Sequence, residues 1–487
     1  FLPLDIDADT PQLLAAMRTG VLLCHLINAV VPDTVDARVL NEGAAPVDEP
    51  DSEEPSAAAE NLQLGLSSLQ SVGAVVGSIS AADLEVGKPT AVVDTVWQLM
   101  KLDVMSDLDI RRSTAEGRGA HLLRLRGEDE ELTDLLKLTP DKMLLRWVNY
   151  HLARAGYGDD ITAIGEQLQD GVALATLVRQ LAPEYCGDIP DGTDALKAME
   201  ATDLVTGVLG AAFGAGVPPW FSVEAITSGN VRLQLGFLAC LHTVAPGLEA
   251  MESELAELIA EEEAAEGESR ESLTLKQWLN SLNLPQVFVH SLFQDVRDGV
   301  LLLKTLDHIE PGIVNWRRAN LPRSQDVGLN RYKRVENCNY VIDLCRAMEF
   351  SLVNVAGLDI VDGNPKLALA LLWQMMRYHT LKILSSAGDG FELEEADIVA
   401  WANAKVEAES GGGCAPMSSF QDPTLATSVF LMHLLNSVRG IVNWSVVTKG
   451  RTDTEKRKNA QYLISVARKM GAAVFCSWED LVSVRAK

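Results

Sequence analysis

"IVDGNPKLALALLWQMM", residues 360–376, is the stretch that decides the fold class of this chain. A polar turn leads into a run in which, from Leu367 to Met376, only Gln374 is polar. This run is too short for a membrane span, which needs roughly 20 apolar residues. The stretch therefore predicts a helix in the core of a globular protein.

Stretches of the same kind recur along the chain. The opening pattern returns as "LEVGKPTAVVDTVWQLM" at 84–100 and as "ITSGNVRLQLGFLACL" at 226–241. A polar turn followed by an apolar helix, as in "DGVLLLKTLDHIEPGIVNW" at 298–316, also begins at residues 19, 170 and 427. A helix with Trp followed by Asn occupies 144–152, 275–282 and 398–406. Recurrence in a fixed order indicates four copies of one unit of roughly 110–130 residues.

The spacing within each unit is helical. In 298–316 the apolar positions cover one broad face at intervals of three and four residues, as a core helix requires. Alternating β-branched runs closed by tight turns are scarce. The expected fold class is all-α, with four helical modules arranged as two tandem pairs.

Cysteine usage and motif content argue against catalysis and metal binding. The seven cysteines are an odd number, contain no CxxC pair and lie mostly in apolar runs, which is typical of buried free thiols. The sequence has no phosphate-binding loop, no HExxH and no GxSxG motif. Asp5, Asp7 and Asp9 resemble the start of a calcium loop, but Thr10 and Ala16 stand where such a loop needs Gly and Glu. We expect no enzyme activity, no cofactor and no metal.

The net charge of −27 is unevenly distributed. Residues 1–248 hold 16 basic and 36 acidic side chains, and residues 249–271 hold 10 Glu against one Arg. Residues 272–487 hold 24 basic and 22 acidic side chains. A charge of this sign repels phosphates, so neither nucleic acid nor an anionic membrane is an expected partner.

The repeated motifs, together with "ENCNYVIDLCRAMEFSLVNVAGLDIVDGNPKLALALLWQMMRYHTL" at 336–381, resemble the calponin-homology module. Four such modules in two pairs are similar to the fimbrin/plastin family. "KLTPDKMLLRWVNYHL" at 137–152 and "NAQYLISVARKMGAAVFCSWEDLVSV" at 459–484 resemble the second and fourth modules of that family. The likeness covers essentially the whole chain, and the calcium-binding EF-hand headpiece of that family is expected to be absent.

This resemblance divides the chain into modules and connectors. The first module, at 1–110, is expected to lack its opening helix, and a connector at 111–136 joins it to the second module at 137–248. An acidic linker at 249–271 leads to the third module at 272–388. The fourth module, at 389–487, is expected to lack its closing helix. Residues 42–60, with seven acidic and no basic side chains, are expected to form a mobile loop.

The resemblance implies that each pair of modules binds an actin filament, so that one chain crosslinks two filaments. The family's contact regions correspond to 88–105 and 138–157 in the first pair, and to 364–382 and the opening of the fourth module in the second. The expected actin-binding residues on these segments are Lys88, Gln98, Lys101, Lys142, Lys366, Gln374, Arg377, Tyr378 and Lys382. Because actin is acidic, the strongly acidic first pair is disfavoured and the binding is expected mainly in 272–487.

The tryptophans and two basic clusters have competing interpretations. Matched positions inside apolar helices favour core packing for Trp97, Trp147, Trp278, Trp373 and Trp401. On the helix 362–381, Leu369, Leu372, Trp373 and Met376 are expected to face inward. The basic clusters at 317–334 and 454–469 are either solvated surface or a docking site for an acidic partner.

Two functions remain open at this stage. The first is a non-catalytic actin-bundling protein of the cytoplasm and cytoskeleton. The second is a structural scaffold, for example in a cilium or axoneme, whose modules bind other cytoskeletal proteins without bundling actin.

Overall fold

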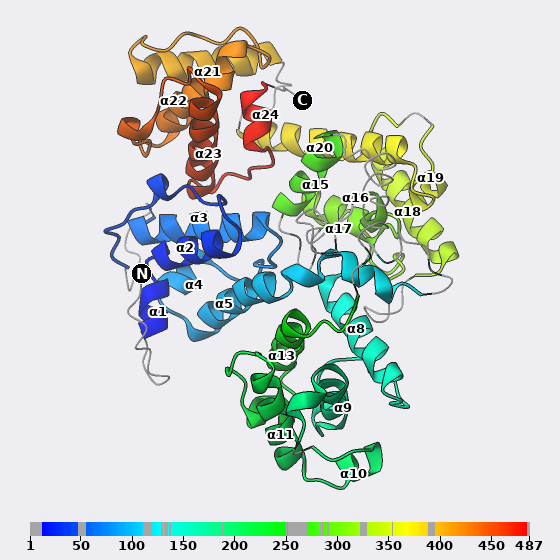
Figure 1. Ribbon diagram of the computed structural model, residues 1–487. Coiled ribbons are helices and arrows are strands. Elements are labelled where there is room, and N and C mark those ends of the chain that lie inside the picture. The colour runs from blue at the N-terminus through cyan, green and yellow to red at the C-terminus, as the bar shows by residue number, and fades with distance from the viewer. Residues whose placement is uncertain are drawn as a thin grey trace. The chain divides into compact units, whose positions relative to one another are not determined.

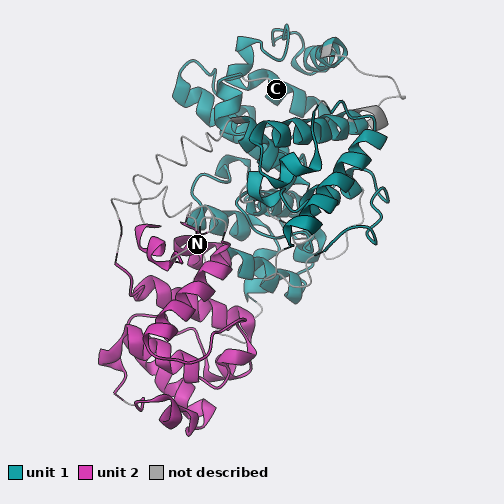
Figure 2. Cartoon of the chain, turned by 90° about the vertical axis from the view of Figure 1, so that its right-hand side faces the viewer, with its two compact units in different colours: residues 1–99, 268–487 teal, residues 100–267 magenta. Residues whose placement is uncertain are grey.

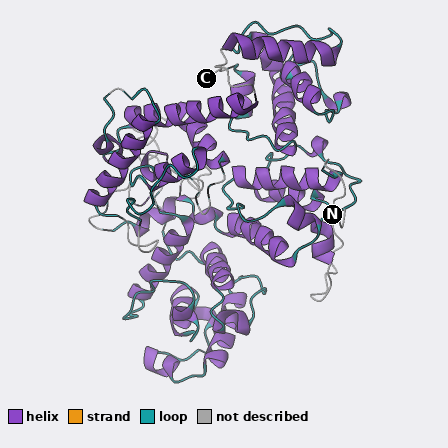
Figure 3. Cartoon of the chain, turned by 180° about the vertical axis from the view of Figure 1, so that it is seen from behind, coloured by secondary structure: helices purple, strands orange, loops and turns teal. Residues whose placement is uncertain are grey.

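The computed structural model describes most of the chain. The residues that it leaves undescribed are 1–11, 47–54, 111–118, 128–129, 131–134, 136–137, 188, 250, 252–269, 283, 285–286, 288, 290–291, 322–328, 353, 388–394 and 485–487. The three aspartates of the calcium-like segment and most of the acidic linker therefore lie outside the described residues. Among the described residues every regular element is a helix and none is a strand (Figure 3). The predicted all-α class is confirmed.

The chain divides into two compact units, residues 1–99 with 268–487, and residues 100–267 (Figure 2). The first unit contains α1 (Gln12–Met17), α2 (Val21–Val30), α3 (Ala57–Ser71), α4 (Ala81–Glu85), most of α5 (Pro89–Val104), α15 (Arg270–Ser281), α16 (Leu292–Asp295), α17 (Val300–Ile309), α18 (Arg331–Ala347), α19 (Gly357–Val361), α20 (Pro365–Ala387), α21 (Glu395–Ser410), α22 (Val429–Val438), α23 (Asp453–Lys469) and α24 (Trp478–Val482). In this unit α3 packs against both α23 and α15 (Figure 1).

The second unit is smaller. It contains the end of α5, the 3-10 helix η3 (Gly119–Leu125), α8 (Pro140–Arg154), α9 (Val172–Leu181), α10 (Thr193–Lys197), α11 (Ala201–Gly214), α12 (Val223–Thr227) and α13 (Val231–Val244). Its core forms where α8 packs against α9 and α13.

The repeated polar turn has the same local geometry in each copy. Gly171 and Gly299 adopt φ of 75° and 74° immediately before α9 and α17. A Cβ atom at Gly299 would lie 2.8 Å from the Cβ of Asn337, so both the backbone angle and the space require glycine there. The preceding Asp298 accepts a hydrogen bond of 2.8 Å from the N–H of Val300, which caps the start of α17. The Asp-Gly dipeptide of the second and third copies is therefore a helix-start signal.

A buried asparagine links that turn to the next long helix in three of the four modules. The Nδ2 of Asn337 in α18 donates to the carbonyl oxygens of Asp298 and Asn320, each at 2.9 Å. Asn61 and Asn459 make the equivalent pairs of bonds in the first and fourth modules. In the second module Val205 lies against the turn glycine instead. The spacing of apolar residues in the sequence does not reveal this repeated contact.

The helix predicted from 362–381 is present as α20 and contributes to the core of the third module. Leu372 and Met376 are buried as expected, whereas Leu369 and Trp373 are only partly buried. The deepest positions also include Leu371 and Met375, which are fully inaccessible. The inward face is thus rotated slightly from the predicted one.

The core assignment of the matched tryptophans is correct for two and wrong for one. Trp147 and Trp278 are buried, and their indole N–H groups donate to the carbonyl oxygen of Pro246 at 2.8 Å and to His379 Nδ1 at 3.4 Å. Trp401 is 51% exposed. Trp147 and Trp278 are covered by the closing segment of their own module, and no described segment covers Trp401 in the same way. Trp97 and Trp373 are half-buried.

The acidic loop expected at 42–60 is shorter than predicted. Helix α3 begins at Ala57, and the Ser56 side chain accepts a hydrogen bond from the N–H of Ala59 as its N-cap. Glu60 is buried within this helix. The prediction of a loop is therefore wrong for 56–60, while 47–54 lie outside the described residues.

All seven cysteines are free thiols, and five of them are buried. Burial raises the pKa of Cys24, Cys338 and Cys345 to about 12, so these thiols stay protonated. Among the helices that the structure describes, none has the length and hydropathy of a bilayer span.

Candidate functional site

The expected contact residues of the second pair lie on α20. Gln374, Arg377 and Tyr378 are spaced by three and four residues and share one face of the helix. Lys366 and Arg377 are exposed, while Gln374 and Tyr378 are half-buried. Neither Lys366 nor Arg377 makes an ion pair or hydrogen bond through its side chain with any described residue. These two cations are available to an external partner.

The remaining two residues of that group are held by one glutamate at the end of α17. The Lys382 Nζ lies 2.6 Å from Glu310 Oε2 and donates to the carbonyl oxygen of Ile309 at 2.8 Å. The Tyr378 hydroxyl donates to the same carboxylate at 3.3 Å. The bonded Lys382 ammonium lowers the pKa of Glu310, and burial with the nearby carboxylate raises the pKa of Tyr378. Glu310 was not anticipated, because only the fold brings residues 310 and 382 together.

In the first unit, Lys88 lies at the start of the predicted segment and Gln98 lies within α5. Lys88 is exposed and pairs with Asp83 at 3.2 Å, and its bond contributes, after that of Ser80, to the lowered pKa of Asp83. Gln98 is half-buried, and its Oε1 accepts from the N–H of Val75 at 3.2 Å. The Gln98 side chain thus supports a loop of its own module.

In the second unit, Lys101 at the end of α5 forms an ion pair of 2.8 Å with Asp141 at the start of α8. Asp141 is next to Lys142, so the structure brings the ends of these two predicted segments together. Lys142 is exposed and has interactions of its own. The first-pair lysines are thus already engaged within the chain, unlike Lys366 and Arg377.

Two cations of the basic cluster at 317–334 pair with acids. Arg318 pairs with Asp343 at 3.0 Å and stacks over the Tyr340 ring at 4.3 Å from its centroid. Arg331 pairs with Asp362 at 2.7 Å. Tyr332, which follows Arg331, is 73% exposed. Residues 322–328 of this cluster lie outside the described part.

The basic cluster at 454–469 faces the first module rather than solvent alone. Arg457 approaches Asp33 at 3.4 Å, and Arg468 Nη1 donates to the carbonyl oxygen of Thr34 at 3.3 Å. Arg38 of the first module donates in return to the carbonyl oxygens of Val446 at 3.2 Å and Lys458 at 2.7 Å. Part of this cluster is therefore occupied by contacts within the chain, including the acidic side chain of Asp33.

A buried charge cluster forms the centre of that contact. Lys469 and Glu60 are both buried, with their charged atoms 3.4 Å apart, and Arg439 also pairs with Glu60. Lys469 Nζ further donates to the carbonyl oxygen of Val39 at 2.7 Å and to Asn41 Oδ1 at 2.9 Å. Burial lowers the pKa of Lys469, and Glu60 opposes that change. No sequence signal joins residues 60 and 439, because both look like ordinary surface charges.

The described residues contain no cluster of ligands suited to a metal ion. In the second unit, His151 and His242 lie edge-on to Trp147, and His121 lies against His242. His242 and His151 are buried, and burial lowers the pKa of both, to about 3 for His242. Neutral imidazoles packed on a tryptophan are part of a core.

Comparison with known proteins identifies each module. The family model "Calponin homology (CH) domain" matches residues 6–104, 138–247, 269–381 and 392–487. Fimbrin-5 of Arabidopsis thaliana is 37% identical over 99% of this chain and 67% of its own length. Fimbrin of Schizosaccharomyces pombe is 37% identical over 99% of this chain and 75% of its length. Plastin-1 of Homo sapiens is 34% identical over 100% of this chain and 74% of its length.

A solved structure gives the same result for the fold. The crystal structure of the actin-crosslinking core of Schizosaccharomyces pombe fimbrin matches with a TM-score of 0.75 and 33% identity. The match covers 99% of this chain and 91% of that one.

Proposed function

This chain belongs to the fimbrin/plastin family of calponin-homology proteins, and from that premise we propose that it binds actin filaments and crosslinks them into bundles. The observation that carries the proposal is the match of all four modules, in order, to the actin-crosslinking core of a fimbrin. The role is structural rather than catalytic, and its place is the actin cytoskeleton.

Two binding pairs on one chain are what crosslinking requires. Once one pair is attached, a second filament within reach meets the other pair at a raised effective concentration. The weak charge attraction of each pair is thereby converted into stable bridging of neighbouring filaments.

The second pair is the stronger candidate for filament attachment. On α20, Lys366 and Arg377 are exposed cations without an acidic partner among the described residues. In the first pair, Lys88 and Lys101 are already paired with Asp83 and Asp141. Attaching an acidic filament through paired lysines would require breaking these ion pairs first, so we assign the larger share of affinity to 272–487.

High-speed sedimentation of the full chain with actin filaments tests this assignment. The double variant K366Q/R377Q should bind about tenfold more weakly than the unaltered chain, because two charge-assisted contacts are lost. The matched variant K88Q/K101Q removes the same charge from the first pair and should bind within about twofold of the unaltered chain. Equal losses in the two variants would contradict the assignment, and no sedimentation of the unaltered chain would contradict actin binding itself.

The alternative of a ciliary scaffold receives no support from the relatives named above, which are fimbrins and a plastin.

A further inference from the structure

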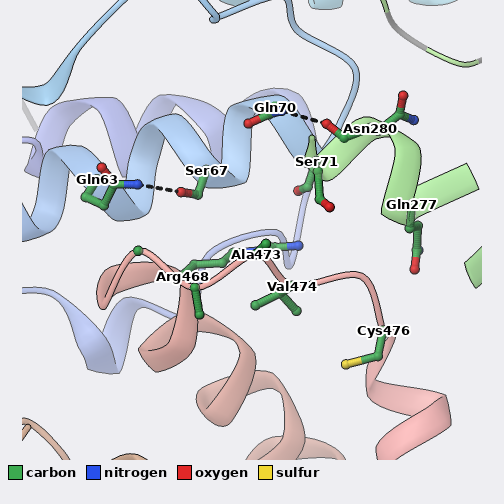
Figure 4. A pocket seen from close by; sticks show the side chains of 13 residues that line it. Gln63, Ser67, Gln70, Ser71, Gln277, Asn280, Arg468, Ala473, Val474 and Cys476 are labelled. Atoms are coloured by element: carbon green, nitrogen blue, oxygen red, sulfur yellow. Dashed lines mark hydrogen bonds between the residues drawn. The ribbon is translucent and has the colours of Figure 1, made fainter. Parts of the chain in front are cut away.

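A polar cavity of about 270 Å³ lies within the first unit, where three modules meet (Figure 4). Helix α3 of the first module contributes Gln63, Ser67, Gln70 and Ser71. Helix α15 of the third module contributes Gln277, Asn280 and Ser281, and the fourth module contributes Arg468 and the segment that follows α23 up to Cys476. We call this space the junction cavity. Its volume is that of several water molecules, so a small metabolite can enter it.

The walls of the junction cavity are joined directly to one another. The Gln70 Nε2 donates to the carbonyl oxygen of Asn280 at 2.7 Å, which ties α3 to α15 (Figure 4). Arg468 ties α23 to the first module through the carbonyl oxygen of Thr34. The cavity is therefore a built feature of the unit, with walls held by hydrogen bonds.

The charge of the cavity is opposite to that of the chain. None of the lining residues is a carboxylate, although the chain as a whole carries −27. Burial raises the pKa of Cys476, so this thiol is neutral and Arg468 is the single ionised group of the lining. Arg468 makes no ion pair with any described acid. Burial lowers its pKa to about 10, which still leaves it protonated at neutral pH. A desolvated guanidinium without a counter-ion favours an oxyanion, which it can bind with two parallel hydrogen bonds.

Three of the uncharged wall groups offer acceptors. The hydroxyl groups of Ser71 and Ser281 donate their hydrogens to the carbonyl oxygens of Ser68 and Trp278, each at 2.7 Å. Their oxygens therefore remain available only as acceptors. The Gln277 Oε1 is buried and accepts no hydrogen bond from any described residue. A molecule that satisfies this wall must bring hydrogen-bond donors.

We propose that the junction cavity binds a small molecule that carries one oxyanion and several hydroxyl groups, the chemistry shared by sugar phosphates and hydroxy acids. The oxyanion contacts Arg468, and the hydroxyl groups donate to Gln277 Oε1 and the serine oxygens. Because α3, α15 and α23 all supply walls, the bound molecule stabilises the association of the first, third and fourth modules.

A neighbouring cleft of about 610 Å³ is less suited to such a ligand. Its lining includes Asp36, whose carboxylate pairs with Arg38, and Asp33, which pairs with Arg457. Acids in this wall repel an oxyanion. Arg468 lines both spaces, together with Ser71, Gln277 and Cys476, so it favours an oxyanion on the side of the junction cavity, whose lining has no acid.

Calorimetry and thermal unfolding of the full chain with glucose 6-phosphate test the proposal, without actin. We expect saturable binding and a higher melting temperature, with glucose and inorganic phosphate each binding at least about tenfold more weakly. Glucose lacks the oxyanion, and phosphate lacks the hydroxyl donors. No binding of glucose 6-phosphate, or equal binding of phosphate alone, would overturn the proposal.

Three variants locate the site. R468Q removes the oxyanion contact and should weaken binding at least about tenfold, whereas R346Q removes an exposed charge of α18 and should change nothing. Because R468Q also loses the bond to Thr34, A473L serves as a second variant that fills the cavity without removing a hydrogen bond. Unchanged binding in A473L would place the ligand elsewhere and overturn the proposal. These outcomes are read without filaments, so they are independent of actin binding.

Discussion

At the residue scale, Asn337 shows how one side chain specifies the module. It is 1% exposed and satisfies two carbonyl oxygens of loops that are far from it in the sequence, while its Oδ1 accepts from the N–H of Asn320 at 2.8 Å. Substitution N337A leaves these groups without partners, so we expect a loss of about 2–3 kcal/mol in the free energy of unfolding. Urea denaturation measures it.

The matched control is N339A, two residues further along α18, where the side chain is exposed. It should change the free energy of unfolding by less than about 0.5 kcal/mol. Since Ala forms helices better than Asn, helix propensity cannot cause a loss, and a similar loss in both variants would contradict a specific role for the buried Asn337 side chain.

The sequence predicted which hydrophobic residues are buried, but it did not predict the burial of this asparagine. An apolar spacing of three and four reports which face is buried, and it placed Leu372 and Met376 correctly. A polar residue such as Asn61, Asn337 or Asn459 looks like surface in the sequence, because its buried partners are backbone groups of distant loops.

At the element scale, the packing of α8 against α13 and η3 depends on neutral histidines. His242 has its ring nitrogen 3.2 Å from that of His121 and lies edge-on to Trp147, and His151 bonds the carbonyl oxygen of Pro246 at 3.1 Å. The titratable groups that face the pair are His121 of η3 and Arg154 of α8, and both lower the pKa of the histidine beside them.

Acid should therefore destabilise the second unit. The pKa of His242 falls from 6.5 to about 3 on folding, so the unfolded chain binds protons that the folded chain does not. The contribution of neutral His242 to the free energy of unfolding is fully present above pH 6.5 and is lost as the pH drops from there towards 3. Each such histidine contributes a slope of up to about 1.4 kcal/mol per pH unit.

Urea denaturation at pH 7.5 and at pH 5.5 measures this slope. In H242L the slope should decrease, since one of the two depressed histidines is gone, whereas H25Q, at an exposed position of α2, should keep it. A slope unaffected by H242L would show that other groups cause the acid sensitivity.

The contact between α17 and α20 gives a second element-scale prediction. Glu310 occupies Lys382 and Tyr378 and adds a negative charge beside the proposed filament-binding face. Substitution E310Q removes that charge and breaks the ion pair with Lys382, so actin affinity in high-speed sedimentation should rise about two- to fivefold. E349Q removes an exposed charge from the loop after α18 and should leave affinity unchanged. A fall in affinity for E310Q would mean that Glu310 positions Lys382 for binding.

The positions of these helices were predictable from the sequence, but the segments that pack against them were not. The Trp-Asn pattern correctly gave helices at α8, α15 and α21, yet Trp401 is exposed while its counterparts are buried. A helix buries a residue only when another segment covers it, and the residue's own spacing carries no information about that segment.

At the scale of the whole molecule, the compact units do not follow the order of the modules along the chain. The first module packs with the third and fourth in one unit through α3, α15 and α23. The contact uses Glu60, Arg439 and Lys469, whose separation of several hundred residues hides their pairing from any local pattern. The sequence did predict the number and order of modules, because each repeat must form its own core.

The crosslinking of actin filaments is the central claim, and low-speed sedimentation tests it most directly. Single filaments stay in the supernatant at low speed, whereas bundles pellet. The full chain mixed with actin filaments at low salt should move most of the actin into the low-speed pellet, and the charge-reversal variant K366E/R377E should leave most of it in the supernatant. Actin that remains in the supernatant with the unaltered chain, while the chain itself binds filaments at high speed, would contradict crosslinking.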